Sequence, residues 1–124
     1  MDSQTYQLIG AAMKVHRTLG PGFLERAYHE ALQREFETSR IPHQSQVPFT
    51  LRYDGGPLQA KYRADFVCYD RVVIELKAQH VVGRLERAQL ENYLRCAEKP
   101  VGLLINFARR SLEYYRVVNP ANRG

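Results

Sequence analysis

The sequence predicts an α/β fold in which helices flank a mixed central β-sheet. Two segments with helical periodicity come first, and three segments rich in β-branched and aromatic residues follow. A further helical segment then precedes two more strand-like segments, so the predicted order is α-α-β-β-β-α-β-β. The β-α-β unit around the third helix should be right-handed and should make its two strands parallel.

Length and composition predict one soluble globular domain over residues 1–124, with a polar tail from about residue 119. The chain is 44% hydrophobic and 25% charged, which is ordinary for a soluble protein. No apolar run approaches the roughly 18 residues needed to cross a bilayer. The first residues lack the basic and apolar regions of a signal peptide. We therefore expect a cytoplasmic protein with no membrane partner.

Charge and cysteine usage narrow the expected partners. The 18 Lys and Arg residues outnumber the 13 Asp and Glu residues and give a formal net charge of +5. Such an excess favours polyanions such as nucleic acid, although many basic proteins bind none. Cys68 and Cys96 are too few for a disulfide framework and lack the spacing of a zinc site.

Two amphipathic helices are predicted at the start of the chain, from Ser3 to about Thr18 and from about Phe23 to Thr38. Gly20-Pro21-Gly22 separates them, because glycine permits a left-handed C-terminal residue and proline cannot continue a helix. We expect His16 to be partly buried with its hydrogen bonds satisfied. The predicted buried positions are Tyr6, Ile9, Met13 and His16 in the first helix and Phe23 or Leu24, Ala27, Ala31, Leu32 and Phe36 in the second.

Three strands are predicted next, at Val47–Tyr53, Leu58–Tyr69 and Arg71–Ala78. The Asp54-Gly55-Gly56 segment between the first two is a turn signal. Pro48 has no N–H to donate to a ladder, so the first strand should lie at an edge of the sheet or begin late.

One helix and two strands complete the predicted fold. The helix extends from about Val82 to Ala97, and the strands are Val101–Phe107 and Ser111–Val118. The first of these strands is nearly all apolar, which is typical of a strand covered on both faces. The predicted buried stripe of the helix consists of Leu85, Ala88, Gln89, Tyr93 and Ala97.

Three charged residues interrupt the second and third strands: Asp65, Glu75 and Lys77. Such residues are almost never fully buried unless they are paired or bind a metal. Carboxylate oxygens suit Mg²⁺, and a neighbouring lysine can orient water or neutralise phosphate charge. The other interpretation is a surface salt bridge on an exposed face of the sheet, which is common and contributes little to stability.

A metal site requires a particular register between these two strands. Glu75 and Lys77 share one face because side chains alternate along a strand, and Asp65 should share its face with Arg63 and Val67. Asp65 lies opposite Glu75 only if the numbers of paired residues sum to an even value. That register requires an odd-length connection or a bulge around Tyr69-Asp70-Arg71. The backbone carbonyl of Leu76, between Glu75 and Lys77 on the third strand, would then be a further metal ligand.

The spacing Asp-x9-Glu-x-Lys resembles the signature of the PD-(D/E)XK nuclease superfamily. Gly22-Phe23-Leu24-Glu25-Arg26-Ala27-Tyr28 also matches the signature of the GxxExxY family within it. The likeness extends from about Leu8 to Val118. It implies a restriction-endonuclease-like core and a Mg²⁺-dependent nuclease, with Mn²⁺ as another usable ion. The other matching segments are Tyr62-Arg63-Ala64-Asp65, Glu75-Leu76-Lys77, Gln89-Leu90-x-x-Tyr93-Leu94 and Gly102-Leu103-Leu104-Ile105-Asn106-Phe107.

The resemblance also implies a role for each matching residue. Asp65 and Glu75 would bind the metal, and Lys77 would be the catalytic lysine. Glu25 matches an acidic residue of the first core helix that contacts metal through water, and Gln89 matches a helix glutamine near the active site. Without the motif, Glu25 would be an ordinary exposed glutamate and Gln89 a polar residue on a helix flank.

DNA is the expected substrate because no RNA-binding motif appears, and RNA stays open as an alternative substrate. Arg63, Arg84 and Arg87 flank the site in sequence and are candidates for phosphate contacts. Tyr28 and Tyr93 could contact substrate, with core packing as the alternative for both. Two rival functions stay open: a structure-specific junction nuclease, for which the size would suit a homodimer, and a non-catalytic module that binds nucleic acid or protein.

Overall fold

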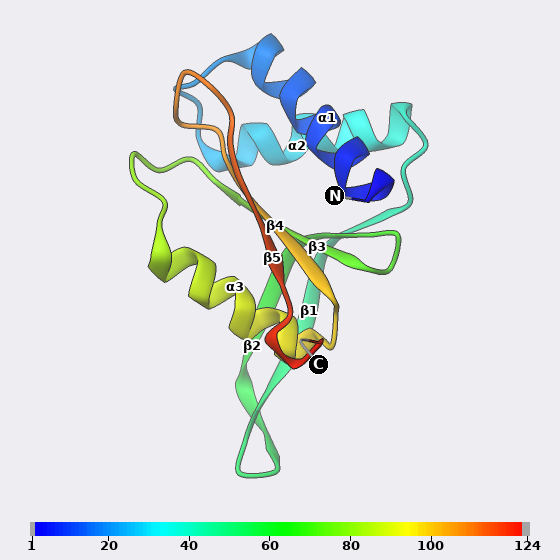
Figure 1. The fold of residues 1–124 in the computed structure, drawn as a ribbon, viewed down its shortest axis with the longest axis vertical. Helices are drawn as coiled ribbons and strands as arrows, with labels where there is room; N and C mark the ends of the chain where they lie inside the picture. The colour runs from blue at the N-terminus through cyan, green and yellow to red at the C-terminus, as the bar shows by residue number, and fades with distance from the viewer. Residues whose placement is uncertain (1, 123–124) are drawn as a thin grey trace.

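The computed structural model describes residues 2–122 and places a five-stranded sheet between helices (Figure 1). The elements are α1 (Ser3–Leu19), α2 (Glu25–Thr38), β1 (His43–Tyr53), β2 (Gly56–Cys68), β3 (Val72–Lys77), α3 (Arg84–Ala97), β4 (Val101–Asn106), β5 (Glu113–Val118) and a short 3₁₀ helix (Pro120–Asn122). The strands lie in the order β1-β2-β3-β4-β5. Only β3 and β4 are parallel, so the predicted mixed sheet is confirmed.

The core consists of two buried clusters, one on each face of the sheet. Helices α1 and α2 cover the first cluster, and α3 covers the second. Strand β4 is buried along its whole length, as its apolar sequence predicts. Strand β1 lies at an edge of the sheet, as Pro48 predicts.

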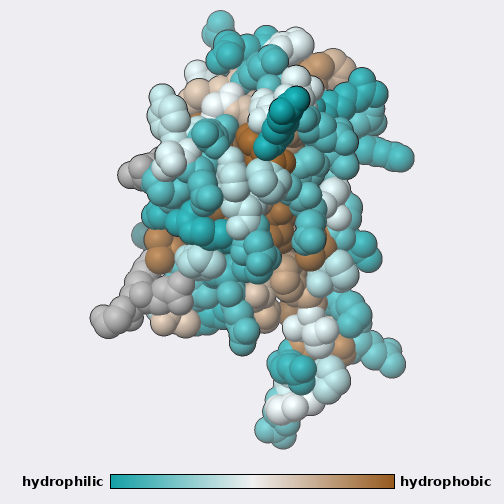
Figure 2. Space-filling model, turned by 90° about the vertical axis from the view of Figure 1, so that its right-hand side faces the viewer, coloured by the Kyte–Doolittle hydropathy of each residue, from teal (hydrophilic) through white to brown (hydrophobic). Residues whose placement is uncertain are grey.

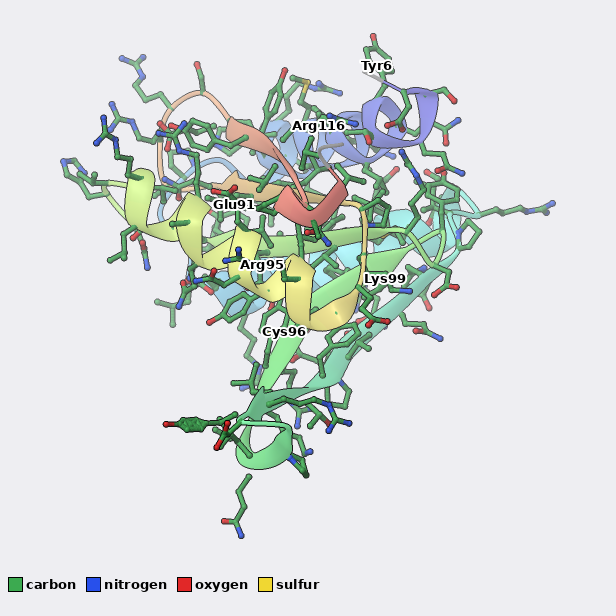
Figure 3. All side chains as sticks on the ribbon, turned by 60° about the horizontal axis from the view of Figure 1, so that its bottom comes forward. Tyr6, Glu91, Arg95, Cys96, Lys99 and Arg116 are labelled. Atoms are coloured by element: carbon green, nitrogen blue, oxygen red, sulfur yellow. The ribbon has the colours of Figure 1, made fainter. Side chains whose placement is uncertain are left out.

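Helix α1 buries only part of the predicted stripe, since Ile9 is buried but Tyr6 and Met13 are not. Tyr6 is 73% exposed and points outward, and Met13 is also exposed (Figure 3). His16 is buried as expected, with its Nε2 2.8 Å from the carbonyl oxygen of Arg109. Asp2 caps the start of the helix by accepting a hydrogen bond from the first helical turn. It also forms ion pairs with Arg71 and Arg116, which connect the helix to distant parts of the chain. The buried residues are Thr5, Leu8, Ile9, Ala11, Ala12, Val15 and His16.

Helix α2 begins at Glu25, later than predicted, and Phe23 and Leu24 are exposed rather than buried. Gly20 has a φ of 70°, so the chain leaves α1 through a left-handed residue. The buried Tyr28 hydroxyl donates a hydrogen bond to the Gly20 carbonyl at 2.6 Å and accepts one from the Phe23 N–H at 3.2 Å. These two bonds hold the segment before the helix as a loop.

All five strands have boundaries that differ from the predicted ones, and the largest difference is at the start of β1. Strand β1 begins at His43 rather than Val47, and His43 pairs with Cys68. Strand β5 begins at Glu113 rather than Ser111. The backbone groups at the buried end of β2 need hydrogen-bond partners, and the first residues of β1 supply them. This need explains why β1 begins before its alternating side-chain pattern does.

The predicted stripe of α3 is also wrong, since its buried residues are Leu90 and Leu94 while Leu85 is 77% exposed. Leu90 lies over Gly102 of β4, whose missing side chain leaves the space that this leucine fills. Cys96 lies on the exposed side of the helix, and neither cysteine forms a disulfide (Figure 3). Within residues 2–122 no helix is both long and apolar enough to cross a membrane.

Strands β1 and β2 continue beyond the sheet as a two-stranded ribbon, which projects from the body of the molecule in Figures 1 and 2. Asp54 and Gly55 form its two-residue turn, with φ values of 53° and 81°. Positive φ at both positions is the geometry of a type I′ hairpin turn. The predicted turn is therefore confirmed, although Gly56 belongs to the second strand.

The contact between Leu90 and Gly102 predicts a loss of stability on replacing Gly102 by alanine. The added Cβ would lie 3.0 Å from Leu90 Cδ2, and Leu90 is itself buried. We expect Gly102→Ala to lower the free energy of unfolding by about 1–3 kcal/mol in urea titrations. Gly10→Ala in α1 is the matched control, because no atom outside the neighbouring backbone of that helix lies within 4 Å of its added Cβ. The control should raise stability by about 0.5–1 kcal/mol, and equal effects of the two changes would contradict the packing described.

Candidate functional site

The register between β2 and β3 is the one that a shared site requires. Phe66 pairs with Ile74, and Cys68 pairs with Val72, so the numbers of paired residues sum to an even value. The connection has three residues, 69–71, an odd number as predicted. The same register places Asp65 opposite Glu75, immediately beyond the last pair of the ladder.

At this point two carboxylates take the place of the backbone ladder. The Leu76 N–H donates a hydrogen bond to Asp65 Oδ2 at 2.8 Å, and the Asp65 N–H donates to Glu75 Oε1 at 3.3 Å. Each strand therefore presents a carboxylate to the backbone of the other. Backbone N–H groups inside a protein need such partners, so the two side chains are fixed where the strands separate.

Each carboxylate keeps one oxygen available. The Tyr62 hydroxyl donates to Glu75 Oε1 at 2.5 Å, the same atom that accepts from the Asp65 N–H. Asp65 Oδ1 and Glu75 Oε2 accept no hydrogen bond from the described residues. No buried side-chain oxygen or nitrogen among those residues lacks a partner, so these two oxygens are not fully buried. One such oxygen on each of the two carboxylates is a suitable pair of ligands for a hard cation.

The Asp65 side of the site opens into a hollow of about 400 Å³ below the start of α2. Glu25 lines this hollow, and Leu76 forms part of its wall. His29, one helical turn after Glu25, stacks on Phe66 with ring centres 4.3 Å apart, and its Nε2 lies 3.2 Å from the Asp65 carbonyl oxygen. The i, i+4 spacing from Glu25 could have revealed His29 in the sequence, but it was not predicted as a site residue.

Beside this hollow the side chains of β2 do not alternate strictly between the two faces of the sheet. Arg63, Asp65 and Val67 therefore do not all share one face, contrary to the prediction. Val67 packs into the cluster under α3, whereas Asp65 lines the hollow on the α2 side. Gln46 of β1, which also lines the hollow, has a φ of 54°. This left-handed residue breaks the alternation of the β1–β2 pair, a feature that the side-chain pattern does not reveal.

Lys77 and Gln89 line a second hollow, of about 350 Å³, between the end of β3 and α3. Lys77 is half-buried and forms no ion pair within residues 2–122. Gln89 is exposed, and its side chain hydrogen-bonds with the Tyr93 hydroxyl. Tyr93 in turn stacks on Tyr62 with ring centres 3.7 Å apart. Gln89 is thus connected to the carboxylates through two tyrosines rather than directly.

A sequence model of the PD-(D/E)XK nuclease superfamily matches residues 2–117. The chain belongs to this superfamily. The resemblance of the sequence to the superfamily and the restriction-endonuclease-like fold that it implies are both confirmed.

A solved structure supports the fold independently. The crystal structure of SSO0001 matches 77% of this chain with a TM-score of 0.63 and 20% sequence identity. The match covers 50% of SSO0001, so the chain spans about half the length of that protein. At this identity the likeness concerns the fold alone. No curated protein matches the chain significantly.

The acidic residues that the superfamily motif designates are brought together in part. The register brings Asp65 opposite Glu75, and Asp65 shares its hollow with Glu25 but not with Glu75. Across the described residues, no group of three or more His, Cys, Asp or Glu side chains could hold a metal ion. Asp65, Glu75 and Glu25 are therefore not gathered into one cluster of three acidic ligands among these residues.

Burial raises the pKa of both carboxyl groups. The pKa of Glu75 rises to about 7, because the negative charge of Asp65 reinforces burial and the Tyr62 hydrogen bond only partly offsets it. Burial also raises the pKa of Asp65, against the opposing effect of the Leu76 hydrogen bond. The positive charge of Lys77 lowers both pKa values but does not restore them. The positive charge of Lys77 is therefore not enough to keep both Asp65 and Glu75 at their ordinary acidity.

The candidate nucleic-acid contacts lie in different surroundings. Tyr28 is fully buried and stacks on Phe107. It therefore packs in the core and does not contact substrate directly. Arg63 and Arg84 are exposed. Arg87 lies with its guanidinium 4.8 Å from the ring centre of Tyr115 on β5, on the flank of α3 away from Lys77. Its side chain is therefore not brought to the carboxylates.

The raised pKa of Glu75 predicts that stability depends on pH. Between pH 4.5 and about 7 the folded protein keeps a proton that the unfolded chain has lost. The free energy of unfolding should therefore fall as the pH rises through this range, by about 3 kcal/mol at most. Urea titrations in EDTA at both ends of this pH range should show that the free energy of unfolding falls in wild type. The same titrations should show no such fall in Glu75→Gln. Glu37→Gln, an exposed change on α2, should behave as wild type, and an unchanged fall in Glu75→Gln would contradict this electrostatic description.

Proposed function

We propose that the protein is a divalent-metal-dependent nuclease that hydrolyses phosphodiester bonds in DNA. The observation that supports the proposal best is the pair of facing carboxylates, Asp65 and Glu75, at the end of the β2–β3 ladder. Membership of a nuclease superfamily gives the reaction class in which such a pair is expected. Lys77 and Glu25 complete the proposed catalytic set.

The residues present fit Mg²⁺ or Mn²⁺. Asp65 and Glu75 each offer an oxygen that is not fully buried, and the Leu76 carbonyl oxygen adds a neutral ligand of the kind that hard cations accept. Both carboxyl pKa values are raised, so a cation would relieve the repulsion between the two groups. When bound, such an ion activates water and stabilises negative charge on a phosphate. Glu25, across the same hollow, would hold an ordered water molecule.

The protein's own groups would orient the reactants. Lys77 is half-buried on the same face of β3 as Glu75, where its ammonium would hold the attacking water or neutralise a phosphate oxygen. Tyr62 keeps the Glu75 side chain in one position through its hydrogen bond and its stacking on Tyr93. Gln89 would help to hold Tyr93 in that stack.

The substrate proposal rests on charge. The net charge of +5 favours a polyanion, and Arg63 and Arg84 are exposed near the site in sequence. We propose DNA because no RNA-recognition motif occurs in the chain. The GxxExxY signature at Gly22–Tyr28 also supports membership of the GxxExxY family. A cytoplasmic location and a homodimer that acts on branched DNA are compatible with this proposal.

A cleavage assay tests the proposed site. We expect wild type to cleave at least one of linear, nicked, single-stranded or branched DNA with Mg²⁺ or Mn²⁺, and EDTA to abolish the reaction. Asp65→Ala and Lys77→Ala should each lower the rate by on the order of a hundredfold or more, because each removes a group that touches the reacting phosphate or its cation. Glu37→Ala, at an exposed position of α2, is the matched control and should cleave as wild type does.

Three outcomes of this assay are informative. Cleavage that survives both site substitutions would place the chemistry elsewhere. Metal-dependent binding of DNA without cleavage by wild type would favour a binding module that retains the fold. Loss in the Glu37→Ala control would show that the effect is not specific to the site.

A further inference from the structure

The β1–β2 ribbon extends farther than the core of the protein requires. Strand β2 pairs with β3 only between Phe66 and Cys68, whereas β1 and β2 remain paired to Tyr53 and Gly56. From residue 52 to 61 every residue is exposed except the half-buried Gly56. Figure 3 shows no other element beside this part of the ribbon. Since a free hairpin is at best marginally stable, its length calls for an explanation outside the core.

The two faces of the ribbon differ near its base. Phe49 and Tyr62, which pair with each other, pack into the cluster under α3. On the opposite face Lys61 pairs with Thr50, and Arg63 is two residues farther along β2. Asp65 is the next residue in this alternation and lines the α2-side hollow. A row of two exposed cations thus leads from the ribbon to the candidate metal site.

The ribbon is basic overall. Between Val47 and Ala64 the chain carries Arg52, Lys61 and Arg63 against one acidic residue, Asp54. The three cations are exposed, and none forms an ion pair with another residue of the described range 2–122. Unpaired cations on a protruding element are suited to phosphate contacts, which dominate affinity for duplex DNA.

We propose that the ribbon binds the duplex arm next to the cleaved phosphate, with its two strands along the major groove. This inference rests on the proposed nuclease function and adds to it a requirement for duplex on one side of the cut. The major groove of B-DNA accommodates a two-stranded ribbon. From Asp65 to the turn at Gly55 the strand covers about 33 Å at about 3.3 Å per residue, close to one turn of duplex, or about 10 base pairs.

A second copy of the chain is a weaker candidate for the same surface. The large exposed apolar side chains of the ribbon are Tyr53 and Leu58, 67% and 42% exposed. A stable protein interface usually buries about 800 Å² on each partner, more than two such side chains provide. The unpaired cations would also repel those of an identical ribbon, whereas they complement phosphate.

The test compares two charge-reversal variants. Arg52→Glu/Lys61→Glu changes the ribbon, and Arg17→Glu/Arg34→Glu changes exposed residues of α1 and α2 by the same net charge. Thermal melting followed by circular dichroism should confirm that both variants fold. Binding is measured by fluorescence anisotropy in EDTA. The two duplexes extend about 5 or about 15 base pairs to one side of the cleavage position mapped with wild type. If wild type gives no cleavage, a nick at a fixed position replaces the cleavage position. Cleavage of the same duplexes is measured with Mg²⁺.

We expect wild type and the control to bind the longer duplex about tenfold more tightly than the shorter one, with the ribbon variant losing this preference. The slope of log affinity against log salt should fall by about 2 in the ribbon variant relative to the control. Equal binding by all three proteins would overturn the ribbon proposal, whether or not wild type cleaves. A ribbon-dependent preference without any cleavage would support duplex binding by the ribbon and overturn its place beside a cleaved phosphate together with the nuclease. A changed sedimentation coefficient of the free ribbon variant, with DNA binding unaltered, would assign the ribbon to self-association instead.

Discussion

Where the ladder between β2 and β3 ends, the carboxylates of Asp65 and Glu75 accept hydrogen bonds from the backbone of the opposite strand. Two neighbouring strands can separate inside a protein only if the N–H groups they release find other acceptors. Here the acceptors are carboxyl side chains, so one arrangement satisfies the backbone and fixes the two carboxyl groups at the point where the strands separate. It also lets β2 leave the sheet with β1 as a ribbon while β3 stays in the core.

The surroundings of the carboxylates determine what they can do. Aromatic rings of Tyr62 and Tyr93 cover the Glu75 side, and the hollow below α2 opens on the Asp65 side. Burial raises both carboxyl pKa values, and Lys77 lies near enough to lower them but forms no ion pair within residues 2–122. Two neighbouring carboxyl groups with raised pKa values would become more acidic beside a divalent cation, which is the basis of the proposed metal site.

Much of the fold could be predicted from the sequence because alternation and turn chemistry act locally. The edge position of β1 was expected from Pro48, and the site hypothesis required the odd connection between β2 and β3 that the structure shows. What could not be predicted depends on distant contacts. Leu90 rather than Leu85 is buried because Gly102 of another element leaves space for it, and α1 is oriented by the ion pairs of Asp2. The change of face beside Asp65 depends on one left-handed residue, Gln46.

The central claim is that the gap between β2 and β3 is a metal site, and a crystal structure of the protein with Mn²⁺ tests it most directly. Anomalous scattering from the ion locates it without reference to activity. The account predicts a peak between Asp65 Oδ1 and Glu75 Oε2, with the Leu76 carbonyl oxygen among the ligands. It also predicts that the peak is absent from an Asp65→Asn/Glu75→Gln variant. An ion bound elsewhere in wild type, or a peak that persists in the variant, would contradict the account.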